Sequence, residues 1–204
     1  MPYSVLMFDF DGTLANSERI VEENLKEFID KYNYPEITAK ELKHLKADSF
    51  FKKLRMLLFM AKIQTQFKER YSQRIPEIEF YEGAQKMLQD SLDAGYQVVI
   101  LSSNAKENIQ DFLRLKKITA PIEVLSSTGF FGKHNTIQKY LNEHQLPTHS
   151  VLYIGDEIRD VKSCNKVKVD IAFAGWGIDA DADLSEYTIK VRVPHPDNLL
   201  PALP

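Results

Sequence analysis

Short apolar runs alternate with amphipathic stretches along most of this 204-residue chain. Runs of about four or five residues, bounded by polar or turn residues, are typical of strands buried in a parallel sheet. They occur at residues 5–8, 97–101, 122–126, 150–154 and 169–173, and a last one, YTIKV, starts near residue 187. The stretches between them have helical spacing and predict helices at residues 82–95, 104–117, 133–144 and 157–166.

Residues 17–78 show a different pattern, because nothing in them resembles a strand. Apolar positions at helical spacing predict one helix that starts near residue 17 and another from about residue 48. Between them, the sequence TAKE at residues 38–41 has the spacing of a capping box and predicts a further helix. We therefore expect an α/β fold, a doubly wound parallel sheet built from residues 1–16 and 79–204, with residues 17–78 inserted as an all-helical domain.

Polar residues follow three of the buried runs at the point where each run ends. Asp9 follows VLMF, with Asp11 two residues further on; Ser102 follows VVIL, and Asp156 follows VLYIG. The carboxyl ends of parallel strands lie at one edge of a sheet, where ligands bind. We therefore expect these four side chains to surround one crevice. Asn104, two residues after Ser102, is expected to cap the helix that follows.

This set of side chains favours a magnesium site. Carboxylates without paired histidines or clustered cysteines form a hard oxygen site, which suits Mg²⁺. The cation offsets the repulsion between the carboxylates and allows a phosphate dianion to approach them. Two charges directly after a buried strand are costly to desolvate. The sequence therefore predicts that they form a metal and phosphate site.

Composition and charge narrow the class of protein. A content of 44% hydrophobic and 27% charged residues is that of a soluble globular protein, and a net charge of −3 argues against nucleic acid as a partner. The single cysteine, Cys164, excludes an internal disulfide, fits a reducing cytosol and is expected in the core. The most apolar stretch, residues 54–63, is too short to span a membrane, and we expect no signal peptide. We expect a cytoplasmic protein and leave its oligomeric state open.

Four motifs resemble those of the haloacid dehalogenase-like (HAD) hydrolase superfamily. DFDGTL at residues 9–14 resembles its first motif and Ser102 after VVIL its second; Lys133 in FFGKHN resembles the third and GDEIRD at residues 155–160 the fourth. Their order and spacing match the family across most of the chain, and residues 17–78 resemble the small cap of its phosphoglycolate-phosphatase-like branch. The resemblance implies a Rossmann-like core and a Mg²⁺-dependent phosphatase that acts on a small phosphorylated metabolite.

The resemblance also implies a role for each matching residue in phosphoryl transfer. Asp9 would be the nucleophile that forms an aspartyl-phosphate, and Asp11 the general acid and then the base. Ser102 would donate a hydrogen bond to the phosphoryl group with help from the amide of Ser103, and either serine could be the one that matches the motif. Lys133 would neutralise the charge that builds up during transfer and would steady Asp9.

The fourth motif supplies the implied metal site. Asp156 would bind Mg²⁺ together with Asp9 and the backbone carbonyl of Asp11. Asp160, one helical turn further on, would support these ligands from behind without binding the metal itself.

Three other functions share part of this pattern. A sugar phosphomutase of the β-phosphoglucomutase type resembles the same core and stays an alternative. A non-catalytic phosphate-binding protein is disfavoured by the intact set of four motifs, and a dehalogenase by Asp11, since those relatives lack the second aspartate.

A basic cluster in the expected cap could bind a second anionic group or form a solvated helix face; it comprises Lys43, His44, Lys46, Lys52, Lys53 and Arg55.

Overall fold

The computed structural model describes residues 2–33, 50–127 and 132–203, and of residues 50–57 and 60 it describes the backbone alone. The chain divides into two compact units, one formed by Met1–Asn16 with Glu79–Pro204 and the other by Ser17–Ile78. We describe each unit by itself. The capping-box sequence at residues 38–41 lies outside the described residues, as do the basic residues at 43–46.

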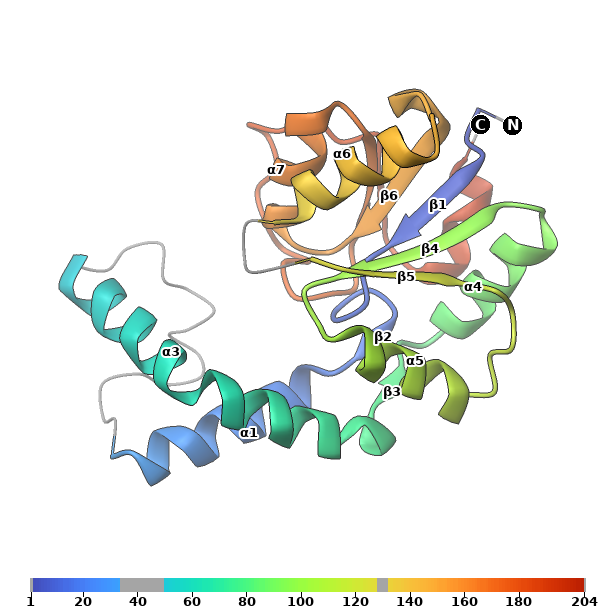
Figure 1. The fold of residues 1–204 in the computed structure, drawn as a ribbon. Helices are drawn as coiled ribbons and strands as arrows, with labels where there is room; N and C mark the ends of the chain where they lie inside the picture. Colours follow the sequence, from blue (N-terminus) through green and yellow to red (C-terminus); the bar gives the residue numbers. More distant parts are fainter. Residues whose placement is uncertain (1, 34–49, 128–131, 204) are drawn as a thin grey trace. The chain divides into compact units, whose positions relative to one another are not determined.

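The first unit is built on a six-stranded sheet in which every pairing is parallel. Its order is β5-β4-β1-β6-β7-β8, so the first strand lies in the middle and the chain builds outward from it on both sides (Figure 1). The expected doubly wound parallel sheet is therefore confirmed. Its strands are β1 (Val5–Phe8), β4 (Gln97–Ser102), β5 (Glu123–Ser126), β6 (Val151–Gly155), β7 (Asp170–Ala174) and β8 (Val191–Val193).

Helices cover both faces of this sheet, with α6 and α7 on one face and α4 and α5 on the other (Figure 1). Because side chains alternate between faces along a strand, odd-numbered residues of β1 such as Val5 and Met7 pack with Ile137 of α6 and Val161 of α7. Cys164 of α7 lies in the same core cluster, as expected. The helices are α4 (Ala84–Asp93), α5 (Lys106–Leu115), α6 (Lys133–Glu143) and α7 (Ile158–Val167), and three short 3₁₀ helices are η3 (Thr148–Ser150), η4 (Pro196–Asn198) and η5 (Leu200–Ala202).

Two details of the sheet differ from the sequence prediction. The last strand was expected at YTIKV near residue 187, but β8 covers Val191–Val193, because Tyr187 forms a turn with Leu184 and its ring packs on the core from that turn. A two-stranded antiparallel ladder, β2 (Ala15–Asn16) with β3 (Glu79–Phe80), was not expected. Strands of two residues carry no alternation of apolar and polar positions that a sequence pattern could show.

Within its described residues, 17–33 and 50–78, the second unit contains helices and turns but no strand. It comprises α1 (Glu18–Lys31), α3 (Phe50–Gln73) and the 3₁₀ helix η2 (Ile75–Glu77). Phe28 of α1 and Ile63 of α3 belong to one buried cluster that joins these two helices. In the parts of the chain that the structure describes, no helix has the length and apolar character that crossing a membrane requires.

Candidate active site

The register of the central strands places the candidate residues at one edge of the sheet. Phe8 of β1 pairs with Ile100 of β4 and with Ile154 of β6, so all three strands end at nearly the same level. Asp9 directly follows Phe8, and its amide nitrogen lies 2.8 Å from the carbonyl oxygen of Ile154. The parallel pairing therefore brings together three segments that are far apart in the sequence.

Asp9 points to the face of the sheet that α6 and α7 cover, as its odd number predicts. There Lys133, the first residue of α6, donates to Asp9 Oδ2 and to Asp160 Oδ1, with both distances 2.6 Å. The second oxygen of Asp9 accepts a hydrogen bond of 2.8 Å from the amide of Phe10. The Lys133 side chain is only 4% exposed, and both carboxylates are buried with it. The residues of the first, third and fourth motifs thus meet in one buried ion cluster.

Asp156 is held beside this cluster by both of its carboxylate oxygens. Thr13 Oγ1 donates to Asp156 Oδ1 and the amide of Ile178 donates to Oδ2, each over 2.8 Å. Backbone passes so close to this side chain that a Cβ atom at Gly12 or at Gly177 would overlap the Asp156 carboxylate. Gly12 also has a φ of +84°, which a side chain would strain. The orientation of Asp156 is therefore fixed by its neighbours.

Asp9, Asp156 and Asp160 together form a group that could hold a metal ion. Each offers a carboxylate oxygen, and these oxygens lie within 4.8 Å of one another. When all are ionised, three carboxylates and the Lys133 ammonium leave two uncompensated negative charges. An additional cation with a preference for oxygen ligands fits both this charge and these donors.

The pKa values of these groups reflect their burial first and the charges of their neighbours second. Burial raises the pKa of Asp9 well above its usual range, Asp160 and Asp156 add to the rise, and Lys133 opposes it. Burial also raises the pKa of Asp156, to about 7, with a further contribution from Asp160. Burial by itself would lower the pKa of Lys133, but Asp160 and Asp9 outweigh it, so the pKa is raised and the ammonium stays protonated.

The other predicted site residues belong to the first and second motifs. Ser102 is buried, and its Oγ accepts a hydrogen bond of 3.0 Å from the amide of Asn104. Ser103 beside it is exposed. Asp11 is partly exposed, and its Oδ2 accepts a hydrogen bond of 3.0 Å from the side-chain amide of Asn104.

The structure corrects the expectation for Asn104. The N-cap of α5 is Ala105, and Asn104 lies one residue earlier, with its side-chain amide directed to Asp11. The helix-capping preference of asparagine cannot reveal this bond, because Asp11 is 93 residues away in the sequence. Sequence reasoning therefore missed Asn104 as a residue of the site.

A loop after β7 was also missed as part of the site. The indole Nε1 of Trp176 donates to the carbonyl oxygen of Thr13 over 3.0 Å, and the amide of Ile178 in the same loop holds Asp156. The sequence GWG directly after a buried strand could have drawn attention to this loop, because glycines allow a close approach of backbone.

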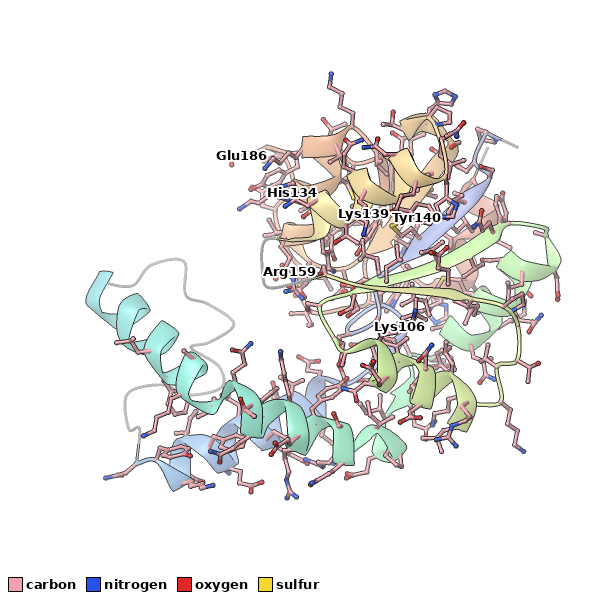
Figure 2. The ribbon with its side chains drawn as sticks, viewed as in Figure 1. Lys106, His134, Lys139, Tyr140, Arg159 and Glu186 are labelled. Carbon is pink, nitrogen blue, oxygen red and sulfur yellow. The ribbon has the colours of Figure 1, made fainter. Side chains whose placement is uncertain are left out.

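Charged side chains of α7 lie close to the ion cluster. Arg159 pairs with Glu157, whose side chain also caps the start of α7 in a capping box with Asp160. Burial would lower the pKa of Arg159, but Glu157, Asp9 and Asp160 outweigh it and raise the pKa. Figure 2 shows Arg159 on α7, and Lys139 on the neighbouring α6.

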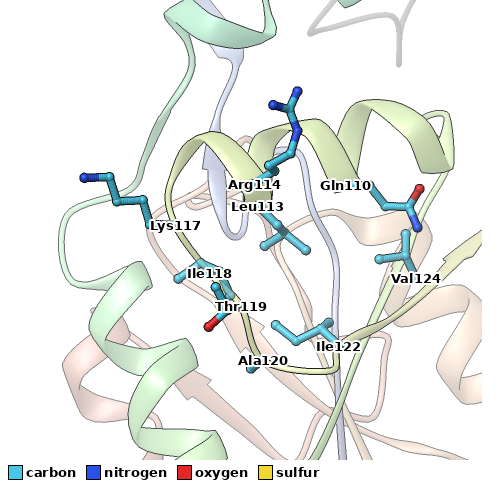
Figure 3. Close-up of a pocket in the computed structure, with 9 residues that line it drawn as sticks. All are labelled: Gln110, Leu113, Arg114, Lys117, Ile118, Thr119, Ala120, Ile122 and Val124. Atoms are coloured by element: carbon cyan, nitrogen blue, oxygen red, sulfur yellow. The ribbon is translucent and has the colours of Figure 1, made fainter.

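A surface depression of about 300 Å³ lies away from these residues. It is formed by α5 and by the segment that leads into β5, and its apolar walls include Leu113, Ile118 and Val124 (Figure 3). It adjoins the amino-terminal end of β5, whereas Asp9 and Asp156 follow the carboxyl-terminal ends of their strands. The depression therefore lies at the opposite end of the parallel strands. It is not part of the candidate site.

Comparison with known proteins identifies the family. The sequence model of the family described as haloacid dehalogenase-like hydrolase matches residues 6–174 of this chain. The chain belongs to this family. The matched residues include all of β1 after Val5, all four motifs and β7, so the family expected from those motifs is confirmed.

Curated relatives of this haloacid dehalogenase-like hydrolase match it over nearly its full length. A phosphoglycolate phosphatase from Synechococcus elongatus is 23% identical to it over 97% of this chain and 96% of the relative. A pyrophosphatase, PpaX, from Bacillus cereus is also 23% identical, over 100% of this chain and 97% of the relative.

Solved structures share the fold. A haloacid dehalogenase-like family protein from Streptococcus pneumoniae matches with a TM-score of 0.82 at 18% identity, with 98% of each chain covered. CbbY from Rhodobacter sphaeroides, solved in complex with phosphate, matches with a TM-score of 0.73 at 14% identity, over 97% of this chain and 96% of CbbY. At these identities the likeness concerns the fold.

Proposed function

We propose that this hydrolase is a Mg²⁺-dependent phosphatase that cleaves a small phosphate monoester through a covalent intermediate on Asp9. The observation that carries the proposal is the buried contact between Lys133 and Asp9 at the end of the central strand, with Asp156 beside it. A carboxylate in this position can serve as a nucleophile because the ammonium holds it in place and offsets the charge of an incoming phosphate.

Asp9, Asp156 and the backbone carbonyl of Asp11 would hold the Mg²⁺ ion. The ion would supply positive charge next to the phosphoryl group, which three carboxylates would otherwise repel. Asp160 would support these ligands from behind without binding the ion; its two oxygens accept hydrogen bonds from Lys133 and from the amide of Glu157. Its contribution would be to orient Lys133.

In the first step a carboxylate oxygen of Asp9 attacks phosphorus, and the bond between phosphorus and the leaving oxygen breaks. Asp11 gives a proton to that oxygen, so that a neutral alcohol departs. Asp11 then takes a proton from water as the water attacks phosphorus, the bond to Asp9 breaks, and inorganic phosphate is released.

Ser102 and Lys133 would bind the phosphoryl oxygens during both steps. Ser102 Oγ accepts a hydrogen bond from the Asn104 amide and, among the described residues, donates none, so its hydroxyl hydrogen is available to a phosphoryl oxygen. The amide of Ser103 would donate a second bond. The protonated Lys133 would stabilise the negative charge that builds up in transfer.

The relatives suggest substrates to test first. One is named for phosphoglycolate and another for pyrophosphate, so both belong in a screen of small phosphorylated metabolites. That residues 17–78 act as a cap that selects the substrate stays a prediction, as does the role of its basic residues.

The test is release of inorganic phosphate by the purified chain with Mg²⁺ and after addition of EDTA. We expect hydrolysis with Mg²⁺, its loss with EDTA, and inhibition by beryllium fluoride, which mimics a phosphoryl group on a carboxylate. Transfer of phosphate to a second hydroxyl of a sugar phosphate, without release, would contradict a phosphatase and support a mutase.

The role of Asp9 is tested by Asp9→Asn, with Asp111→Asn as its matched control. Asp111 is an exposed acid on α5 that pairs with Arg114, so the control makes the same chemical change away from the site. We expect activity to fall by a factor of about 10³ or more in Asp9→Asn, because an amide is not a nucleophile. Unaltered activity of Asp9→Asn would show that the nucleophile is assigned wrongly.

A further inference from the structure

Asn104 is fixed by hydrogen bonds at each of its polar groups. Its backbone amide donates to Ser102 Oγ over 3.0 Å, and its carbonyl oxygen accepts from Ser126 Oγ over 2.7 Å. Its side-chain oxygen accepts from the amide of Ala105 and from Asn108 Nδ2, both over 2.8 Å. Its side-chain nitrogen donates to Asp11 Oδ2 over 3.0 Å. Asn104 therefore connects strand β4, strand β5, helix α5 and the loop that carries Asp11.

The orientation of the Asn104 amide follows from its partners. The backbone N–H of Ala105 can only donate, so the side-chain atom that faces it has to be oxygen. The NH₂ group consequently faces Asp11, whose carboxylate can accept it. Turning the amide over would set two donors against each other at Ala105 and two acceptors against each other at Asp11.

We propose that Asn104 is a positioning residue, which holds the carboxyl group of Asp11 in the orientation that delivers a proton to the leaving oxygen. The inference rests on the phosphatase function proposed above and extends it to a residue outside the four motif positions. Through its backbone amide the same residue holds Ser102 Oγ, so the phosphoryl-binding hydroxyl and the proton donor are held by one rigid unit.

If Asn104 only stabilised the start of α5, its hydrogen bond to Asp11 would not be needed. The start of α5 needs the Asn104 side-chain oxygen, which serves Ala105 and Asn108, but not the NH₂ group. The two functions of the side chain can therefore be separated by substitution. Asn104→Asp keeps an oxygen for Ala105 and Asn108 and removes the donor to Asp11, whereas Asn104→Ala removes both.

The test compares substrates whose leaving groups differ in their need for a proton. Departure of an alkoxide needs protonation by Asp11, whereas p-nitrophenolate leaves without it. We measure kcat/KM, which reports the steps up to departure of the leaving group, for p-nitrophenyl phosphate and for the best alkyl phosphate of the screen. The ratio of the two values does not depend on how much of a variant is folded.

We expect Asn104→Asp and Asn104→Ala to lose about 10- to 100-fold in kcat/KM for the alkyl phosphate, a part of the 10²–10⁴ that general acid catalysis contributes. For p-nitrophenyl phosphate we expect a loss several-fold smaller. Asp11→Ala sets the largest change in the ratio that loss of the acid can produce. Asn165→Asp is the matched control, since Asn165 also donates through its side-chain nitrogen and accepts through its oxygen, both with Thr188.

Each outcome decides between the two proposals. If the kcat/KM of Asn104→Asp falls by the same factor for both substrates, or does not fall for either, Asn104 does not position Asp11. The proposed phosphatase function then stands. If Asp11→Ala changes the ratio and Asn104→Asp does not, the positioning role is likewise overturned. If the wild-type chain hydrolyses neither substrate, the proposed function fails and this inference fails with it.

Discussion

Lys133 Nζ lies 2.6 Å from Asp9 Oδ2, and both side chains are almost completely buried. The two residues are 124 positions apart, and their contact joins the end of the central strand to the start of α6. A charge in such a place depends on its ion-pair partner, because desolvation is costly and the attraction between opposite charges offsets part of that cost.

Lys133→Met is therefore expected to destabilise the protein strongly. Removing one partner of a buried ion pair leaves the remaining carboxylates uncompensated, which costs about 3–5 kcal/mol in the free energy of unfolding. Urea unfolding measures this loss of stability, and phosphatase activity should fall as well.

The control for this change is Lys139→Met on the same helix. Lys139 is exposed and 3.7 Å from Glu143, so its loss should cost less than about 1 kcal/mol. Equal unfolding midpoints for the two variants would show that the buried pair does not stabilise the fold.

Gly177→Ala is expected to weaken metal binding by displacing Asp156. A Cβ atom at residue 177 would overlap the Asp156 side chain and the carbonyl oxygen of Gly12, so the loop or the carboxylate has to move. Mg²⁺ affinity, measured by calorimetry, should fall about tenfold or more, as expected when the support of a metal ligand is lost.

Gly95→Ala separates this effect from a general loss of stability. Gly95 has a φ of +86°, but a methyl group at this position would meet no atom within 4 Å. The change should therefore cost about 1–2 kcal/mol of stability and leave Mg²⁺ affinity intact. If both alanine variants bind Mg²⁺ equally well, the close approach at Gly177 does not control the site.

The stability of the metal-free protein should fall as pH rises, and Asp156 should account for part of the fall. Its pKa is raised to about 7 in the folded chain, against about 3.9 when unfolded, so the folded state binds the proton more tightly. This stabilising contribution is present at low pH and is lost between about pH 4 and pH 7. Mg²⁺ prefers the ionised carboxylate and should stabilise the protein more at pH 8 than at pH 5.

Asp156→Asn removes the titrating group and tests this assignment. The difference in free energy of unfolding between wild type and this variant, in buffer with EDTA, should shift against the wild type as pH rises from 4 to 8. A difference that stays constant over this range would contradict the raised pKa of Asp156.

Trp176 provides an optical signal from the site, because it is the single tryptophan of the chain and its indole donates to the carbonyl oxygen of Thr13. Binding of Mg²⁺ with beryllium fluoride near Thr13 and Asp156 should change its fluorescence in a saturable way. Trp176→Phe should remove the signal, and Asp156→Asn should abolish its response to Mg²⁺. The same response in Asp156→Asn would place the ion elsewhere.

The sequence by itself determined the parallel sheet and the residues at its edge. Apolar runs that end in Asp9, Ser102 and Asp156 are local patterns, and the geometry of a parallel sheet converts them into neighbours. The same local patterns located α4 to α7 within a few residues, because amphipathic spacing and helix termini are properties of adjacent positions.

Only the tertiary structure decided which side chains contact one another at that edge. The bond of Lys133 to Asp160, the amide of Asn104 at Asp11 and the indole of Trp176 at Thr13 each join separate segments of the chain. No local pattern encodes such a partner, because it depends on how strands and helices pack and on which buried polar groups are left to pair with one another.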